Sequence, residues 1–140
     1  MIKLIYRLLN NNGDYTFVAD IDITTAEKPV RMTRSVVYYE IFTSKYDIYH
    51  KSLISPEANE FIDLVKQAKI NTWPDAYTID NSNGKNELGV YNVCLVAGGV
   101  AYFPMGFEGK VPEGYDKLLE AIRMCDKRVT EFLSPIPLDE

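Results

Sequence analysis

The chain has 140 residues, of which 46% are hydrophobic and 12% aromatic, and its formal net charge at pH 7 is −5. This length suits a single domain over residues 1–140 with a core of its own, and the composition is not that of a disordered chain. The negative charge opposes binding to a phosphate backbone, so nucleic acid is a less favoured partner than protein.

Targeting and redox signals are sparse. Arg7 interrupts the apolar N-terminal stretch and no small-residue cleavage site follows, so we expect no signal peptide. No apolar run reaches the length of a membrane span. Cys94 and Cys125 lack CxxC or Cys/His spacing, and we expect both to be buried free thiols. These features predict a cytoplasmic protein without a membrane contact.

The first half of the chain reads as strands followed by a helix. Residues 2–9 and 15–24 alternate between apolar and polar, and the Asn-Gly step between them is a strong hairpin signal. Residues 31–43 form a long strand that is apolar on both faces in its middle, which is typical of a strand covered on both sides. Ser55, Pro56 and Glu57 then provide a helix start, with the Ser hydroxyl as the cap, and helical spacing continues over 56–69.

The second half repeats this order with different spacing. A strand near 75–80 and a turn at 81–84 precede a tight hairpin, in which Gly98-Gly99 would pair Ala97 with Val100 and Leu95 with Tyr102. An apolar stripe predicts a closing helix over 113–133, and residues 134–140 form a proline-rich C-terminal tail. The pattern predicts an α+β, two-layer fold. Its mainly antiparallel sheet has about six or seven strands in two hairpin clusters, each followed by a helix.

Catalytic and metal-binding patterns are weak. His50 is the only imidazole, and a dyad with Cys94 would need an activating environment that the sequence does not provide. Asp20 and Asp22 share one side of a strand and could hold a divalent cation, but alternation alone predicts polar residues there. No glycine-rich phosphate loop is present. We therefore expect no metal and no cofactor.

Residues 36–51 (VVYYEIFTSKYDIYHK) concentrate four tyrosines within a stretch, 28–51, that carries five basic and two acidic residues. Alternation assigns Val37, Tyr39, Ile41, Tyr46 and Ile48 to the core. The remaining residues mix aromatic and charged types, as protein interfaces do. The candidate partner-binding set is Arg34, Tyr38, Glu40, Tyr49 and Lys51.

The favoured hypothesis is a small acidic cytosolic, non-enzymatic binding protein of the inhibitor, adaptor or immunity type. It would dock a macromolecular partner, most simply a protein, through an aromatic sheet face. Three alternatives stay open: a carboxylate- or metal-dependent enzyme, a single-stranded nucleic-acid binder through residues 28–51, and a homodimer. The same stretch would also suit a buried sheet with basic flanks.

Overall fold

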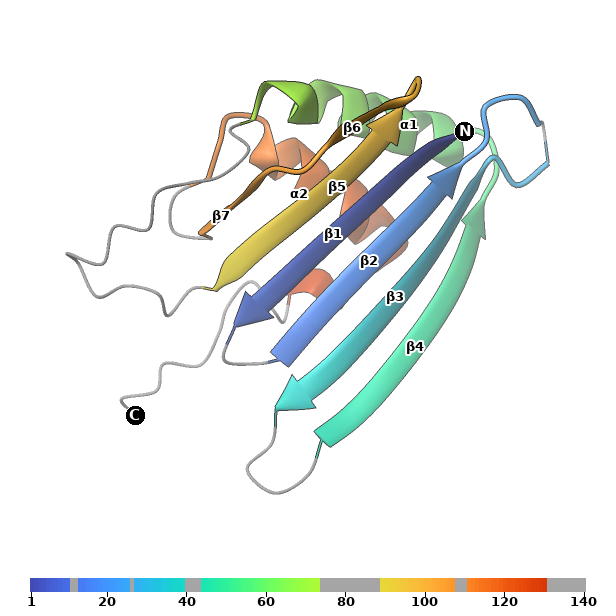
Figure 1. Ribbon diagram of the computed structural model, residues 1–140. Coiled ribbons are helices and arrows are strands. Elements are labelled where there is room, and N and C mark those ends of the chain that lie inside the picture. Colours follow the sequence, from blue (N-terminus) through green and yellow to red (C-terminus); the bar gives the residue numbers. More distant parts are fainter. Residues whose placement is uncertain (11–12, 26, 40–43, 74–88, 108–110, 131–140) are drawn as a thin grey trace.

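The computed structural model describes residues 1–10, 13–25, 27–39, 44–73, 89–107 and 111–130. These residues form a seven-stranded antiparallel sheet with two α-helices, which confirms the predicted α+β two-layer fold (Figure 1). The strands are β1 (Ile2–Asn10), β2 (Gly13–Ile21), β3 (Val30–Tyr39), β4 (Ser44–Leu53), β5 (Val90–Ala97), β6 (Val100–Tyr102) and β7 (Met105–Phe107). The helices are α1 (Glu57–Ala68) and α2 (Tyr115–Cys125), and a 3-10 turn, Ile70–Thr72, follows α1.

The strands lie in the order β4-β3-β2-β1-β5-β6, and β7 also pairs with β5. Both predicted hairpins are confirmed. β1 pairs with β2 from Ile2 opposite Ile21 to Asn10 opposite Gly13, and the second hairpin places Ala97 opposite Val100 and Leu95 opposite Tyr102. The first strand cluster, β1 to β4, therefore supplies one side of the sheet, and β4 ends it.

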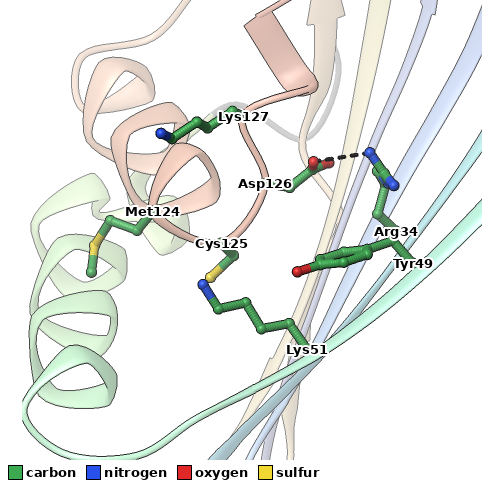
Figure 2. A pocket seen from close by; sticks show the side chains of 7 residues that line it. All are labelled: Arg34, Tyr49, Lys51, Met124, Cys125, Asp126 and Lys127. Carbon is green, nitrogen blue, oxygen red and sulfur yellow. Dashed lines mark hydrogen bonds and ion pairs between the residues drawn. The ribbon is translucent and has the colours of Figure 1, made fainter.

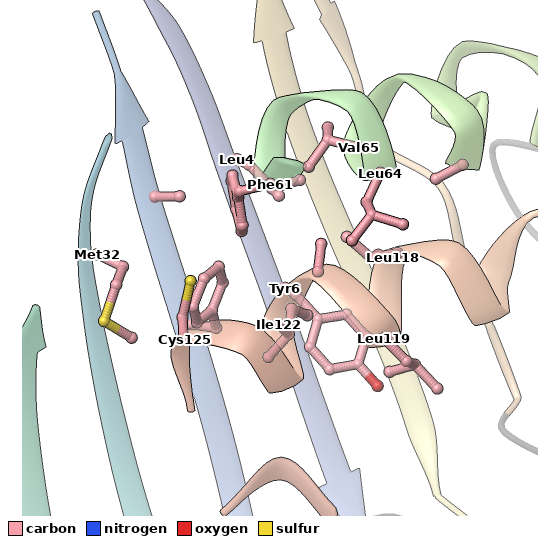
Figure 3. Packing of buried hydrophobic residues seen from close by; sticks show 14 of the residues in the cluster. Leu4, Tyr6, Met32, Phe61, Leu64, Val65, Leu118, Leu119, Ile122 and Cys125 are labelled. Atoms are coloured by element: carbon pink, nitrogen blue, oxygen red, sulfur yellow. The ribbon is translucent and has the colours of Figure 1, made fainter. Parts of the chain in front are cut away.

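Both helices pack on one face of the sheet (Figure 1). Alternate residues of each strand point to the helices and are buried, as with Leu4, Tyr6 and Leu8 of β1. Phe61, Leu64 and Val65 of α1 and Leu118 and Ile122 of α2 meet them from the other layer (Figure 3). Each such fully buried large apolar side chain stabilises the fold by roughly 1.5–3 kcal/mol. Among the described residues no element covers the second face, which we call the open face.

The faces of β3 and β4 are the reverse of those predicted. Val30, Met32, Arg34 and Val36 of β3 are buried on the helix side, whereas Val37 is only half-buried on the open face. β3 is the second strand from the edge and is not covered on both sides. Alternate residues of a strand point to the same face, and the face of Val37 also carries the polar residues Arg31, Thr33 and Ser35. This face is therefore the less buried of the two. The side chains of Tyr39 and Ile41 lie outside the described set.

The helix ends also differ from expectation. α1 begins at Glu57 with Pro56 at the N-cap and no side-chain cap, so the predicted Ser55 cap is wrong. The Ser55 hydroxyl instead accepts from the Asn59 amide at 3.4 Å. α2 ends at Cys125, well before the predicted residue 133, because Asp126 adopts an extended conformation. The predicted strand near 75–80, the turn at 81–84 and the tail at 134–140 lie outside the described residues.

Candidate functional site

A pocket of about 290 Å³ lies between β4 and the C-terminal end of α2 (Figure 2). It brings together residues of β3, of β4, of the last turn of α2 and of the turn that follows α2. The lining residues are Arg34, Tyr49, Lys51, Met124, Cys125, Asp126 and Lys127. Three of the five residues in the predicted contact set, Arg34, Tyr49 and Lys51, are therefore neighbours in space.

Arg34 forms the floor of this region and is only 6% exposed. Its Nη1 lies 3.1 Å from Asp126 Oδ1 and its Nη2 lies 3.3 Å from Asp47 Oδ2. The guanidinium carbon also sits 5.0 Å from the ring centroid of Tyr49. The expectation that Arg34 is partly exposed is wrong. It points to the helix layer, where two carboxylates compensate its buried charge.

Asp126 is the centre of this polar cluster. Its Oδ2 accepts a 2.6 Å hydrogen bond from the Tyr15 hydroxyl, and its Oδ1 accepts from the backbone N–H of Arg128 at 3.1 Å. Burial, and then the hydrogen bond to Asp126, hold the pKa of Tyr15 well above its ordinary value. The extended backbone at Asp126 ends α2 and turns its carboxylate towards Tyr15 and Arg34. The cluster therefore ties the end of α2 to β2 and β3.

Tyr38 is placed differently from Tyr49. It is partly buried against the core, and the guanidinium carbon of Arg128 lies 5.3 Å from its ring centroid. Arg128 Nη1 also lies 3.3 Å from Asp47 Oδ2. Tyr38 shares the helix side with Tyr49 but is covered by the segment after α2, so the two rings do not form one exposed patch. Glu40 lies outside the described residues.

Tyr49 and Lys51 fit the predicted contact role better. Tyr49 is 41% exposed and Lys51 is half-buried, and both extend from β4 along the pocket. In Figure 2 the ring of Tyr49 lies beside the Arg34 side chain, and the amine of Lys51 points towards Cys125. Burial raises the pKa of the Cys125 thiol to about 12, which keeps it protonated at neutral pH and unsuited to act as a nucleophile.

The sequence prediction missed two exposed apolar residues of β4. Tyr46 and Ile48, assigned to the core, are 63% and 50% exposed on the open face. His50 follows on the same face, and its Nδ1 forms a 3.1 Å hydrogen bond with the Thr33 hydroxyl. The polar residues His50 and Ser52 alternate with the same period as Tyr46 and Ile48 and therefore share their face. Their polarity was the sequence signal that this face is exposed.

The strand register separates His50 from Cys94, the two residues considered as a catalytic dyad. His50 is opposite Thr33, Thr33 opposite Val18, Val18 opposite Ile5 and Ile5 opposite Cys94. Four inter-strand steps of about 4.8 Å place the two positions roughly 19 Å apart. Cys94 is also only half-buried on the open face, so the prediction of two buried thiols holds for Cys125 alone.

Of the two carboxylates considered for a metal, Asp22 is engaged locally. Asp22 accepts from the hydroxyl of Thr24 at 2.6 Å and from its N–H at 3.1 Å, and these bonds hold the pKa of Asp22 below its ordinary value. Asp20 and Asp22 border a second pocket of about 440 Å³, together with Lys28 and Arg31. Within the described ranges no three His, Cys, Asp or Glu side chains gather in a way that could hold a metal ion.

In the described part of the chain neither helix has the length and apolar character needed to cross a bilayer. No protein-family model and no curated protein sequence matches the chain. The arrangement of the residues is therefore the basis for a functional proposal.

Proposed function

We propose that this protein is a small acidic cytoplasmic binding protein without enzymatic activity, of the inhibitor, adaptor or immunity type. Its contact surface is β4 together with the adjoining open face of the sheet. The observation that carries the proposal is the exposure of large apolar side chains on both faces of this one edge strand. Tyr46 and Ile48 project on the open face, and Tyr49 projects on the helix side.

Exposed apolar groups gathered on one element support an interface, because an isolated soluble domain rarely exposes a contiguous apolar patch without a functional reason. Half-buried apolar residues continue the surface inward from Tyr46 and Ile48 along the open face, including Ile5, Val18 and Val37. Tyrosine at the centre of such a patch is typical of protein interfaces. The net charge of −5 favours protein over nucleic acid as the partner.

The test is affinity capture from native lysate with the tagged chain, followed by mass spectrometry. The test variant is Tyr46→Ser/Ile48→Ser. Its matched control is Val100→Ser/Phe103→Ser, which removes similarly exposed side chains, 49% and 61% exposed, at the opposite edge of the sheet. Both variants should keep the wild-type unfolding midpoint within a few degrees, since exposed substitutions change stability little.

The proposal expects at least one protein that wild type and the Val100/Phe103 control capture and that the Tyr46/Ile48 variant loses. If the same proteins are captured equally by all three chains, or if mild crosslinking also yields no specific partner, the assignment of this surface is wrong.

A further inference from the structure

We infer that β4 takes up an extended, acidic segment of the partner protein as an additional strand of the sheet. Alternate side chains of that segment would enter the pocket between β4 and the end of α2. This inference rests on the proposed function and specifies the chemistry of the partner. It joins three observations, which are the edge of β4 that pairs with no strand in the described part of the chain, the position of the pocket beside that edge, and the charge of the pocket.

The edge of β4 is long enough to bind an extended chain. Its ten residues pair with β3 on one side, from Leu53 opposite Val30 to Ser44 opposite Tyr39. On the other side no strand among the described residues pairs with it. Such an edge presents a row of backbone donors and acceptors, and strand addition is a recurring mode of peptide recognition on edges of this kind.

The pocket lies where alternate side chains of an added strand would point. Tyr49 and Lys51 share the helix side of β4 and line the pocket, whereas Ile48 and His50 share the open face. Side chains of paired strands that lie opposite each other point to the same face, about 4.5–5.5 Å apart. An added residue opposite Tyr49 would therefore face the pocket, and its two neighbours would lie beside Ile48 and His50 on the open face.

The charge of the pocket selects an acidic segment. Its lining carries three cations, Arg34, Lys51 and Lys127, against one carboxylate, Asp126, which gives a local charge of +2 in a chain of net charge −5. Because Asp126 and Asp47 pair with Arg34, the excess positive charge of the lining lies on Lys51 and Lys127. Carboxylates on the helix side of the added strand would meet this excess charge, and apolar side chains on its open side would extend the Tyr46 and Ile48 surface.

A second copy of the chain fits this edge less well. Pairing β4 with β4 of another copy around a two-fold axis would bring two pockets of charge +2 next to each other. The repulsion is largest at low ionic strength, where an acidic ligand is attracted most strongly. Added salt should therefore weaken the binding of an acidic segment and strengthen the pairing of two copies, which distinguishes the two occupants.

The probe is a fluorescein-labelled peptide of about ten residues, the length of β4, in which Glu alternates with Val or Thr. Binding is measured by fluorescence anisotropy at low and at moderate salt. Two further peptides are the same sequence with Lys in place of Glu, and the Glu peptide N-methylated at alternate residues so that one edge cannot donate hydrogen bonds. The protein variant is Lys51→Glu/Lys127→Glu. Its control, Lys3→Glu/Lys66→Glu, changes the net charge equally at exposed positions away from the pocket.

The Glu peptide should bind wild type and the Lys3/Lys66 control with similar affinity. It should bind the Lys51/Lys127 variant at least about tenfold more weakly, because two favourable pairings become repulsive. The Lys peptide and the N-methylated peptide should not bind wild type measurably. Equal binding of the N-methylated peptide, equal binding by the two charge variants, or no binding of the Glu peptide at low salt would each overturn the inference.

Failure of this inference is distinguishable from failure of the proposed function. If a captured partner depends on Tyr46 and Ile48 but is retained by the Lys51/Lys127 variant, the binding function stands and the strand-addition model is wrong. A dimer that forms with rising protein concentration and is broken by Ile48→Pro would assign the edge to a second copy instead.

Discussion

Replacing Arg34 with Met should destabilise the protein by about 3 kcal/mol. The substitution leaves Asp126, with 4% of its side chain exposed, as a buried carboxylate without its 3.1 Å ion-pair partner. Breaking one side of a buried ion pair typically costs roughly 3–5 kcal/mol, because the remaining charge is not compensated. The Tyr15 hydroxyl and the Arg128 N–H still donate to Asp126, which places the expected loss near the lower end of that range.

The measurement is urea unfolding followed by the fluorescence of Trp73, which is the single tryptophan of the chain and is 5% exposed. A loss of about 3 kcal/mol corresponds to a fall in the thermal midpoint of roughly 10 °C for a domain of this size. In the urea experiment the midpoint concentration should fall. The dependence of the unfolding free energy on urea concentration should not change, since the surface exposed on unfolding stays nearly the same.

Arg7→Met is the matched control. Arg7 pairs with Asp14 through two of its nitrogens, but 48% of the Arg7 side chain is exposed. An exposed pair of this kind contributes at most about 1 kcal/mol. If Arg34→Met lost no more stability than Arg7→Met, the argument that Asp126 is a buried charge held mainly by Arg34 would be refuted.

Two further predictions concern other parts of the fold. Raising the pH from about 9 towards 12 should lower the free energy of unfolding, because the Cys125 thiol has its ordinary pKa of 9.0 in the unfolded chain and a pKa of about 12 in the folded chain. Cys125→Ala should make this alkaline decline shallower in urea titrations at a series of pH values. Gly114→Ala should cost several kcal/mol in the same assay, since Gly114 has a φ of 94° and its Cβ would lie 2.2 Å from the Ala68 carbonyl oxygen. Gly98→Ala is the control, with a φ of 59° and open space around the added methyl, and it should lose only about 1 kcal/mol.

Local signals predicted much of the architecture. The Gly-Gly step sets the connection of the second hairpin, and a short connection fixes the register of the strands that it joins. The second hairpin therefore has the predicted pairs, including Leu95 opposite Tyr102. The positions of α1 and α2 were also predictable, because an apolar helix face depends only on residues that are three or four positions apart.

The faces of β3 and β4 could not be assigned from such local patterns. Arg34 suggested a solvent-facing side, but its charge is compensated by Asp126, ninety-two residues further along the chain. A buried charge and an exposed charge have the same appearance in a sequence until the partner is known. Arg34 is opposite Tyr49, so an inward Arg34 places Tyr49 on the helix side as well. Because side chains alternate along β4, Lys51 then shares that side, whereas Tyr46 and Ile48 lie on the open face. The partner of Arg34 is thus the information that was missing when the faces of β3 and β4 were predicted.

The same ion pair connects stability with the proposed binding site. The Arg34 guanidinium lies against the Tyr49 ring, so it holds that ring at the wall of the pocket before any ligand binds. A pre-organised side chain lowers the ordering cost of association. Arg34→Met should therefore weaken both folding and binding of the acidic peptide. Lys51→Glu/Lys127→Glu, which changes residues at the rim of the pocket, should weaken binding while leaving the unfolding midpoint near that of wild type. If the Arg34 variant instead bound the peptide as wild type does, Tyr49 would not depend on Arg34 for its position, and the acidic segment would be selected by the two lysines alone.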